Sequence, residues 1–95
     1  MIDLGLAAKV RPGLILSRYP ADDELAFAVI IPHTTALRGN RWEYKTNLPF
    51  LDSGAFHLQQ IQPVSLPKLM WRLGVLPMSE FRAIKQRLIL ELELA

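Results

Sequence analysis

The sequence lacks cysteine altogether, which excludes a disulfide-stabilised fold, a cysteine-ligated metal and a thiolate nucleophile. It has only two histidines, His33 and His57, too few for a typical histidine-rich zinc site. Its five glycines are scattered, so no glycine-rich loop is available to cradle a phosphate. Because no Asp, Glu or His residues cluster at metal-ligand spacing either, we expect a protein that uses no metal and no cofactor.

Long hydrophobic runs are also missing. The longest apolar run covers residues 25–32, far short of the ~20 residues that span a bilayer. The N-terminus has no basic segment followed by an apolar one, so a signal peptide is not expected. These features predict a protein without a membrane segment that works in the cytoplasm, and the absence of cysteine fits a reducing compartment.

Charge of one sign is equally scarce. The 95 residues carry 11 Lys and Arg against 9 Asp and Glu, a net charge of only +2. This balance excludes a histone-like protein, although an isoelectric point near 9.3 permits an anionic partner. Hydrophobic residues make up 51% of the chain, too many for a disordered protein. We expect one domain over residues 1–95, because the chain is too short for a second core.

Most of the sequence has the character of β-strands. We predict strands over residues 13–17, 25–31, 41–46 and 56–64, the last broken at Pro63, and one helical turn over residues 67–70. Turn-forming residues 20–23 lie between the first two strands, which predicts a β-hairpin. Residues 41–46 alternate charged and aromatic side chains, so we expect a solvated strand. Trp42 and Tyr44 then share one face, which we place in the core, although a nucleobase could also stack on them.

The last segment is helical. From Met78 onward, apolar residues recur every three to four positions, at Phe81, Ile84, Leu88 and Leu92. Such a stripe is typical of a helix that packs one face on a core. Strands followed by a single helix predict a mainly β fold, a small barrel with a C-terminal helix.

Few residues are suited to catalysis. Ser17, His33 and His57 lie in no recognisable nucleophile motif, and the two histidines could meet only across strands, so we expect structural or surface roles for both. Arg11 precedes one strand and Thr34 follows another. If these strands are neighbours, a guanidinium fork and a hydroxyl could together hold a phosphate. The alternative is a surface arginine and a simple strand-end hydroxyl.

Four segments together resemble the MazF/PemK family of type II toxin-antitoxin toxins. Residues 9–17 have an Arg-Pro followed by an apolar strand that ends in serine, and residues 31–35, Ile-Pro-His-Thr-Thr, are similar to the family's Pro-x-Thr-Ser/Thr. Residues 58–64 are similar to its Asp-Gln-Ile-Arg-Thr-Val, although Gln59 and Gln62 replace the Asp and the Arg. Leu-Gly-Val-Leu at 73–76 precedes the last helix, as in the family. The four lie in register over nearly the whole chain, with a first strand that is truncated or short.

The resemblance implies an SH3-like barrel, usually a homodimer, that cleaves single-stranded RNA without metal and is silenced by an antitoxin protein. The products would carry 2′,3′-cyclic phosphate and 5′-OH ends. By the motif match, Arg11 would be the catalytic arginine and Thr34 the catalytic threonine. The remaining RNA-binding candidates are Lys9, Ser17, Thr35, Arg38, Arg41 and Gln60.

Two other interpretations stay open. A gyrase-poisoning toxin of the CcdB type would share the barrel, but that family acts through an aromatic-containing C-terminal end, whereas this chain ends in Glu-Leu-Glu-Leu-Ala. The second interpretation is a binding module that has the same fold but no catalytic activity. Cleavage of RNA in the presence of a chelator would separate these interpretations from the nuclease.

Overall fold

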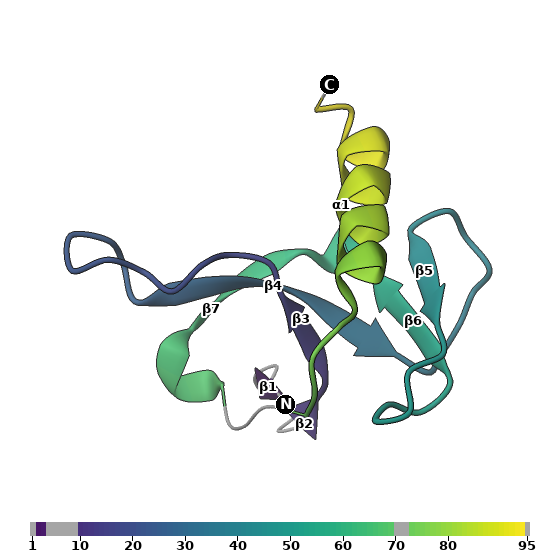
Figure 1. Cartoon of the computed structure of the whole chain (residues 1–95), viewed down its shortest axis with the longest axis horizontal. Helices are drawn as coiled ribbons and strands as arrows, with labels where there is room; N and C mark the ends of the chain where they lie inside the picture. Colours follow the sequence, from purple (N-terminus) through teal and green to yellow (C-terminus); the bar gives the residue numbers. More distant parts are fainter. Residues whose placement is uncertain (1, 4–9, 70–72, 95) are drawn as a thin grey trace.

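Strand β4 is the centre of the sheet in the computed structural model, which describes residues 2–3, 10–69 and 73–94 (Figure 1). Ile30 of β4 pairs with Ile15 of β3 and with Gln62 of β7, so these two strands lie on opposite edges of β4. All pairings are antiparallel, and a separate two-stranded ladder joins β1 to β2. The strands are β1 (Ile2–Asp3), β2 (Val10–Arg11), β3 (Gly13–Ile15), β4 (Phe27–Thr34), β5 (Glu43–Thr46), β6 (Gly54–His57) and β7 (Gln62–Ser65).

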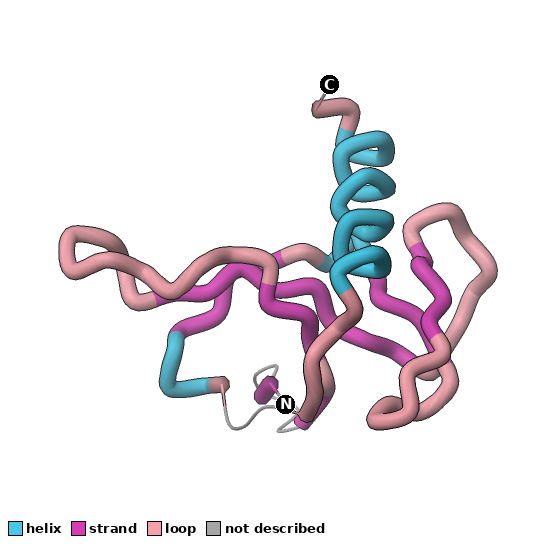
Figure 2. The backbone as a smooth tube through the Cα atoms, viewed as in Figure 1, coloured by secondary structure: helices cyan, strands magenta, loops and turns pink. Residues whose placement is uncertain are grey.

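The predicted hairpin is confirmed, with β3 and β4 as its strands. The turn between them is closed by a hydrogen bond from the Glu24 N–H to the Ala21 carbonyl, 3.0 Å long. The connecting residues 16–26 form a long arm that projects away from the helix (Figures 1 and 2). The predicted end of the second strand at residue 31 is wrong, because β4 continues through Pro32 to Thr34. Pairing resumes after the proline, where the His33 N–H donates to the Pro12 carbonyl at 2.9 Å.

The predicted strand over residues 56–64 is also wrong, because two strands and a 3₁₀ turn occupy this region. β6 pairs with the end of β4, where Phe56 faces His33, and β7 pairs with its beginning, where Gln62 faces Ile30. Between these two pairs, β4 spans three residues, from Ile30 to His33, whereas the opposite chain spans six, from Phe56 to Gln62. The three extra residues form the 3₁₀ turn η1 (Leu58–Gln60), which leaves the plane of the sheet. Pro63 lies within β7.

The C-terminal helix α1 (Met78–Leu92) confirms the prediction and closes the core. Its Ile84 and Leu88 are buried against β4 and β6 side chains, and Trp42 and Tyr44 pack on the same cluster, as expected for core residues. The Tyr44 hydroxyl donates to the Glu80 carboxylate at 2.7 Å and so ties β5 to the first turn of the helix. The buried core residues of this cluster are Ile31, Phe56, Leu58, Ile84 and Leu88.

The architecture is the predicted one, a mainly antiparallel β fold with a single C-terminal helix. The described strands form a curved, barrel-like sheet that does not close into a complete ring. The predicted helical turn is present as η2 (Leu66–Lys68), whereas Met70 and Trp71 lie outside the described residues. Within the described part of the chain, no helix has both the length and the apolar character of a membrane span.

His33 is buried on the core side of β4, with 3% of its surface exposed. Its ring meets the Phe56 ring edge to face, with centroids 5.3 Å apart. Its Nε2 atom has no hydrogen-bond partner among the described residues. Burial lowers the pKa of this imidazole below its ordinary value of 6.5, and the nearby Asp52 carboxylate opposes that shift only in part. His33 is therefore a neutral core residue, as its expected structural role requires.

Replacing Ile84 with alanine should lower the free energy of unfolding by about 2–5 kcal/mol, because it empties a fully buried position in a packed cluster. Ile89 on the same helix is 41% exposed and serves as a matched control. Ile89→Ala should cost less than about 1 kcal/mol. Urea unfolding followed by circular dichroism measures both values, and equal losses would contradict this description of the core.

Stability should fall as the pH is lowered from neutrality through about 6.5, the ordinary imidazole pKa. The sign follows from His33: its pKa is lower in the folded chain, so the unfolded chain binds the proton more readily. Urea midpoints at about pH 7.5 and 5.5 measure the loss in the wild type. His33→Leu removes the titrating group and should lose less stability over this range. An unchanged pH dependence in the variant would show that His33 is not responsible.

Candidate functional site

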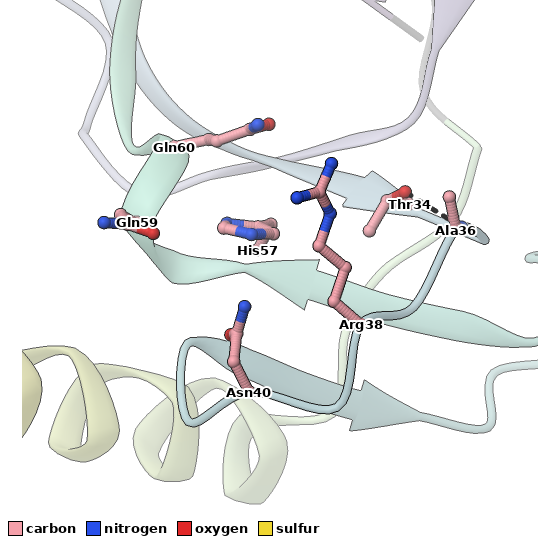
Figure 3. Close-up of a pocket in the computed structure, with 7 residues that line it drawn as sticks. All are labelled: Thr34, Ala36, Arg38, Asn40, His57, Gln59 and Gln60. Atoms are coloured by element: carbon pink, nitrogen blue, oxygen red, sulfur yellow. Dashed lines mark hydrogen bonds between the residues drawn. The ribbon is translucent and has the colours of Figure 1, made fainter.

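A polar pocket of about 480 Å³ opens where β4 ends (Figure 3). Four structural elements supply its walls: the end of β4, the loop over residues 35–42, the end of β6 and the turn η1. The lining residues are Thr34, Ala36, Arg38, Asn40, His57, Gln59 and Gln60. Hydroxyl, guanidinium, imidazole and amide groups therefore surround a volume large enough for a small ligand or part of a larger one.

Thr34 reaches the pocket because β4 and β6 approach closely at this point. A Cβ atom on Gly54 would lie only 2.2 Å from the Thr34 carbonyl oxygen, so a side chain there would force the strands apart. The Thr34 hydroxyl accepts a hydrogen bond from the Ala36 N–H at 3.1 Å, which fixes the first residues of the following loop. The last residue of β4 is thus held in position by a strand on one side and a turn on the other.

The loop over residues 35–42 is organised by Glu43, the first residue of β5. The Glu43 carboxylate accepts the N–H groups of Arg38 at 2.7 Å and Gly39 at 2.8 Å. The expected solvated strand is therefore wrong at this residue, which is only 6% exposed. Glu43 is buried because its carboxylate satisfies backbone N–H groups of the loop that would otherwise lack a partner. Gly39 adopts a positive φ of 77°, which lets the loop turn toward this carboxylate.

These hydrogen bonds also favour the ionised form of Glu43. The Arg38 N–H is the main cause of a lowered pKa for Glu43, and the N–H groups of Gly39 and Asn40 act in the same direction. Glu43 is ionised at neutral pH, but its oxygens face backbone donors. Among the described residues that line the pocket, only Arg38 carries a permanent charge. In Figure 3 its guanidinium extends between His57 and Thr34, so the pocket is suited to an anionic ligand.

The 3₁₀ turn η1 contributes two amide side chains that a regular strand would have placed differently. Because η1 leaves the sheet, Gln59 and Gln60 both line the pocket, although neighbouring residues on a strand face opposite ways. Gln60 was an expected binding residue, whereas Ala36, Asn40, His57 and Gln59 were not. The sequence did carry one signal: in Leu58-Gln59-Gln60-Ile61 the apolar residues are three apart, a helical spacing.

The backbone of Arg11 lies at the same end of β4. The β3–β4 register pairs Gly13 with Pro32, and the bond from His33 to Pro12 continues it by one residue. Arg11 precedes Pro12 in the chain, and Thr34 follows His33 as the last residue of β4. The condition stated from the sequence, that the strand after Arg11 and the strand before Thr34 be neighbours, is met by β3 and β4. The side chain of Arg11, like the whole of Lys9, lies outside the described part of the structure.

Other predicted binding residues lie elsewhere. The Ser17 hydroxyl accepts the Val29 N–H at 2.9 Å within the hairpin arm, so it holds the two strands together. Arg41 forms an ion pair with Glu91 of α1, with 3.2 Å between Nε and Oε2, and its guanidinium covers the Trp42 ring. Thr35 is exposed beside Thr34 but does not line the pocket. Of the described binding candidates, the structure brings Arg38 and Gln60 together with Thr34.

Metal ligands do not gather in the described residues: no group of three His, Asp or Glu side chains is close enough to hold an ion. The pocket has the groups needed to bind a phosphate and to form hydrogen bonds with neighbouring sugars or bases. Arginine supplies a planar fork of donors, and the asparagine and glutamine amides can both donate and accept.

Comparison with known proteins identifies the fold. No protein-family model matches the chain, and a search of curated proteins finds no match. Among solved structures, the chain is similar to the Mycobacterium tuberculosis toxin MazF-mt6, with a TM-score of 0.73 and 24% sequence identity. The alignment covers 87% of this chain and 86% of that one. The chain therefore has the fold that the four sequence motifs predicted.

Proposed function

We propose that this chain is the toxin of a type II toxin-antitoxin system and a metal-independent endoribonuclease that cleaves single-stranded RNA. One observation supports the proposal above all. On a fold shared with MazF-mt6, a pocket at the end of β4 combines the Thr34 hydroxyl, the Arg38 guanidinium and the amides of η1. The β3–β4 pairing next to Pro12 and His33 is compatible with a site that combines Arg11 and Thr34, the two residues proposed as catalytic from the sequence.

The proposed chemistry needs only side chains of this protein. Arg11 would neutralise the scissile phosphate while the ribose 2′-hydroxyl attacks in line, and Thr34 would donate a hydrogen bond to a phosphate oxygen. The reaction leaves a 2′,3′-cyclic phosphate and a 5′-hydroxyl. Because the nucleophile is the 2′-hydroxyl, DNA is not a substrate.

Binding of the remaining RNA is assigned to residues around the pocket. Arg38 and Gln60 would contact the RNA within it, and Thr35 at its edge. Ser17 on the hairpin arm and Arg41 near α1 remain proposed contacts outside the pocket, and Lys9 remains a proposed contact on the basis of the sequence. The resemblance further implies an antitoxin protein as partner, a homodimer as the working form, and action in the cytoplasm.

The proposed function predicts cleavage that survives a chelator. The purified protein should cut a long single-stranded RNA in EDTA as fast as in magnesium, and the fragments should end in a 2′,3′-cyclic phosphate and a 5′-hydroxyl. Gel analysis before and after phosphatase and kinase treatment identifies the ends. Cleavage that disappears in EDTA and returns with magnesium would contradict the metal-free mechanism. A folded protein that binds RNA without cutting it would indicate a binding module.

Thr34→Val should slow cleavage by about 10²-fold, in the lower range for loss of one hydrogen bond to a developing charge. Arg11→Ala should abolish cleavage, and Arg11→Lys should impair it strongly because lysine lacks the planar fork. Thr46→Val is a matched control, since the Thr46 hydroxyl has no hydrogen-bond partner among the described residues. Single-turnover rates on one RNA measure all four variants. Normal cleavage by Arg11→Ala would refute the assigned site.

Glu43→Gln should weaken RNA binding several-fold, because a neutral amide holds the N–H groups of Arg38 and Gly39 less firmly than a carboxylate does. The exchange of these two amide hydrogens with solvent should accelerate at the same time. Glu80→Gln is the control: it weakens the bond to Tyr44 at the helix and leaves the loop intact. Fluorescence anisotropy with a 2′-O-methyl RNA, which cannot be cleaved, measures affinity. Equal affinities for the two variants would show that Glu43 does not position the loop.

A further inference from the structure

His57 is a pocket residue to which the sequence motifs assign no catalytic role. It is the last residue of β6, directly before η1, and its side chain lines the cavity (Figure 3). Its Nδ1 atom is buried and has no hydrogen-bond partner among the described residues. Buried side-chain nitrogens in folded proteins are nearly always hydrogen-bonded, and an unpartnered one at a pocket calls for an explanation. Because Nδ1 itself is shielded, other atoms of the residue form the wall of the cavity, so a ligand there would lie beside the imidazole.

The strand register places His57 on the same face of the sheet as Thr34. Thr34 pairs with Ala55, so these two side chains share a face, and His57 lies two residues further along β6. His33 and Phe56 form the neighbouring pair and face the core instead. The chain's two histidines are therefore separated by the sheet: one is a buried core residue, and the other stands diagonally across from the proposed catalytic threonine.

The charged groups near His57 come from two elements. Glu43 of β5 pairs directly with His57, and its negative charge acts on the imidazole even though its oxygens are bound to backbone N–H groups. Arg38 approaches from the loop over residues 35–42 with the opposite charge. From β4, the pocket receives only the neutral Thr34 side chain. The imidazole thus lies between one anion and one cation.

We propose that His57 is a further catalytic residue, the base that takes the proton from the ribose 2′-hydroxyl. This inference rests on the proposed ribonuclease function. In the step, neutral His57 accepts the 2′-hydroxyl proton as the 2′-oxygen forms its bond to phosphorus. The bond from phosphorus to the 5′-oxygen breaks, and that oxygen takes a proton from water. The hydroxide left behind removes the proton from His57, so the side chain returns to its neutral state.

The reaction needs a group that accepts the 2′-hydroxyl proton, and the two expected catalytic residues do not supply one. Arginine stays protonated and threonine stays neutral at physiological pH, so neither readily accepts a proton. Histidine is the side chain whose charge ordinarily changes between pH 5 and 8. Among the described residues that line the pocket, His57 is the only histidine.

The test compares single-turnover cleavage of one RNA by the wild type, His57→Gln and His57→Ala, with folding checked by thermal unfolding. His57→Gln should slow cleavage by about 10²-fold or more. Its affinity for a 2′-O-methyl RNA should stay close to that of the wild type. The wild-type rate should rise with pH between about 5 and 7, while the rate of His57→Gln should lack this rise. Added imidazole should partly restore cleavage by His57→Ala, because it can occupy the vacated volume and accept the proton.

His33→Leu is the matched control, since it removes the other histidine and should leave the pH–rate profile unchanged in the folded protein. If His57→Gln cuts RNA at the wild-type rate, or keeps the rise with pH, the proposal for His57 is wrong while the ribonuclease function stands. If the folded wild type cuts no RNA, the proposed function fails, and the role of His57 fails with it. Slower cleavage without imidazole rescue and with an unchanged pH profile would reduce His57 to a structural residue.

Discussion

The close approach of β4 and β6 is the constraint on which the rest of the site depends. With no side chain on Gly54, the Thr34 carbonyl can lie where a Cβ atom would otherwise be. That contact fixes the register in which His33 faces Phe56, and this register separates the two faces of the sheet. One face packs on Ile84 and Leu88 of α1, and the other presents Thr34 and His57 to the pocket. The pairing of β4 with β6 therefore positions both the core residues on one face and the pocket residues on the other.

The same pairing accounts for η1. β6 and β7 both pair with the same edge of β4. The chain from Phe56 to Gln62 is three residues longer than the segment of β4 opposite it, from Ile30 to His33. The excess forms a 3₁₀ turn that places Gln59 and Gln60 at the pocket, while Leu58 stays in the core. Opposite η1, Glu43 holds the loop that carries Arg38. Both walls are irregular segments attached to a regular sheet, an arrangement that keeps binding groups in fixed positions.

Much of the fold was predictable from the sequence because local signals and tertiary structure agree there. The apolar stripe through Ile84 and Leu88 predicted α1, and the turn before residue 24 predicted the hairpin. Predictions failed where pairing overrides local pattern. Pro32 does not end β4, because the His33 N–H resumes the ladder, and Glu43 is buried in an alternating segment because backbone donors 4 and 5 residues away bind it.

The site was predictable only in part for the same reason. Arg11 and Thr34 are proposed from motifs, and the β3–β4 register brings the chain segments beside them to the same end of the sheet. His57 could not be assigned to the pocket from the sequence, because it shares a face with Thr34 only through the pairing of Thr34 with Ala55, a tertiary contact. Ser17 illustrates the converse: its hydroxyl suits RNA binding by type, yet it is bonded to the Val29 N–H in the hairpin arm.

The central claim is that RNA binds in the pocket at the end of β4. The most direct test is to add a short 2′-O-methyl RNA to the isotope-labelled protein and follow backbone amide shifts by NMR. The account predicts that the largest changes occur at Thr34, in the loop over residues 35–42, and from His57 through Gln60. Changes confined to the hairpin arm or to the exposed face of α1, with these pocket residues unaffected, would contradict it.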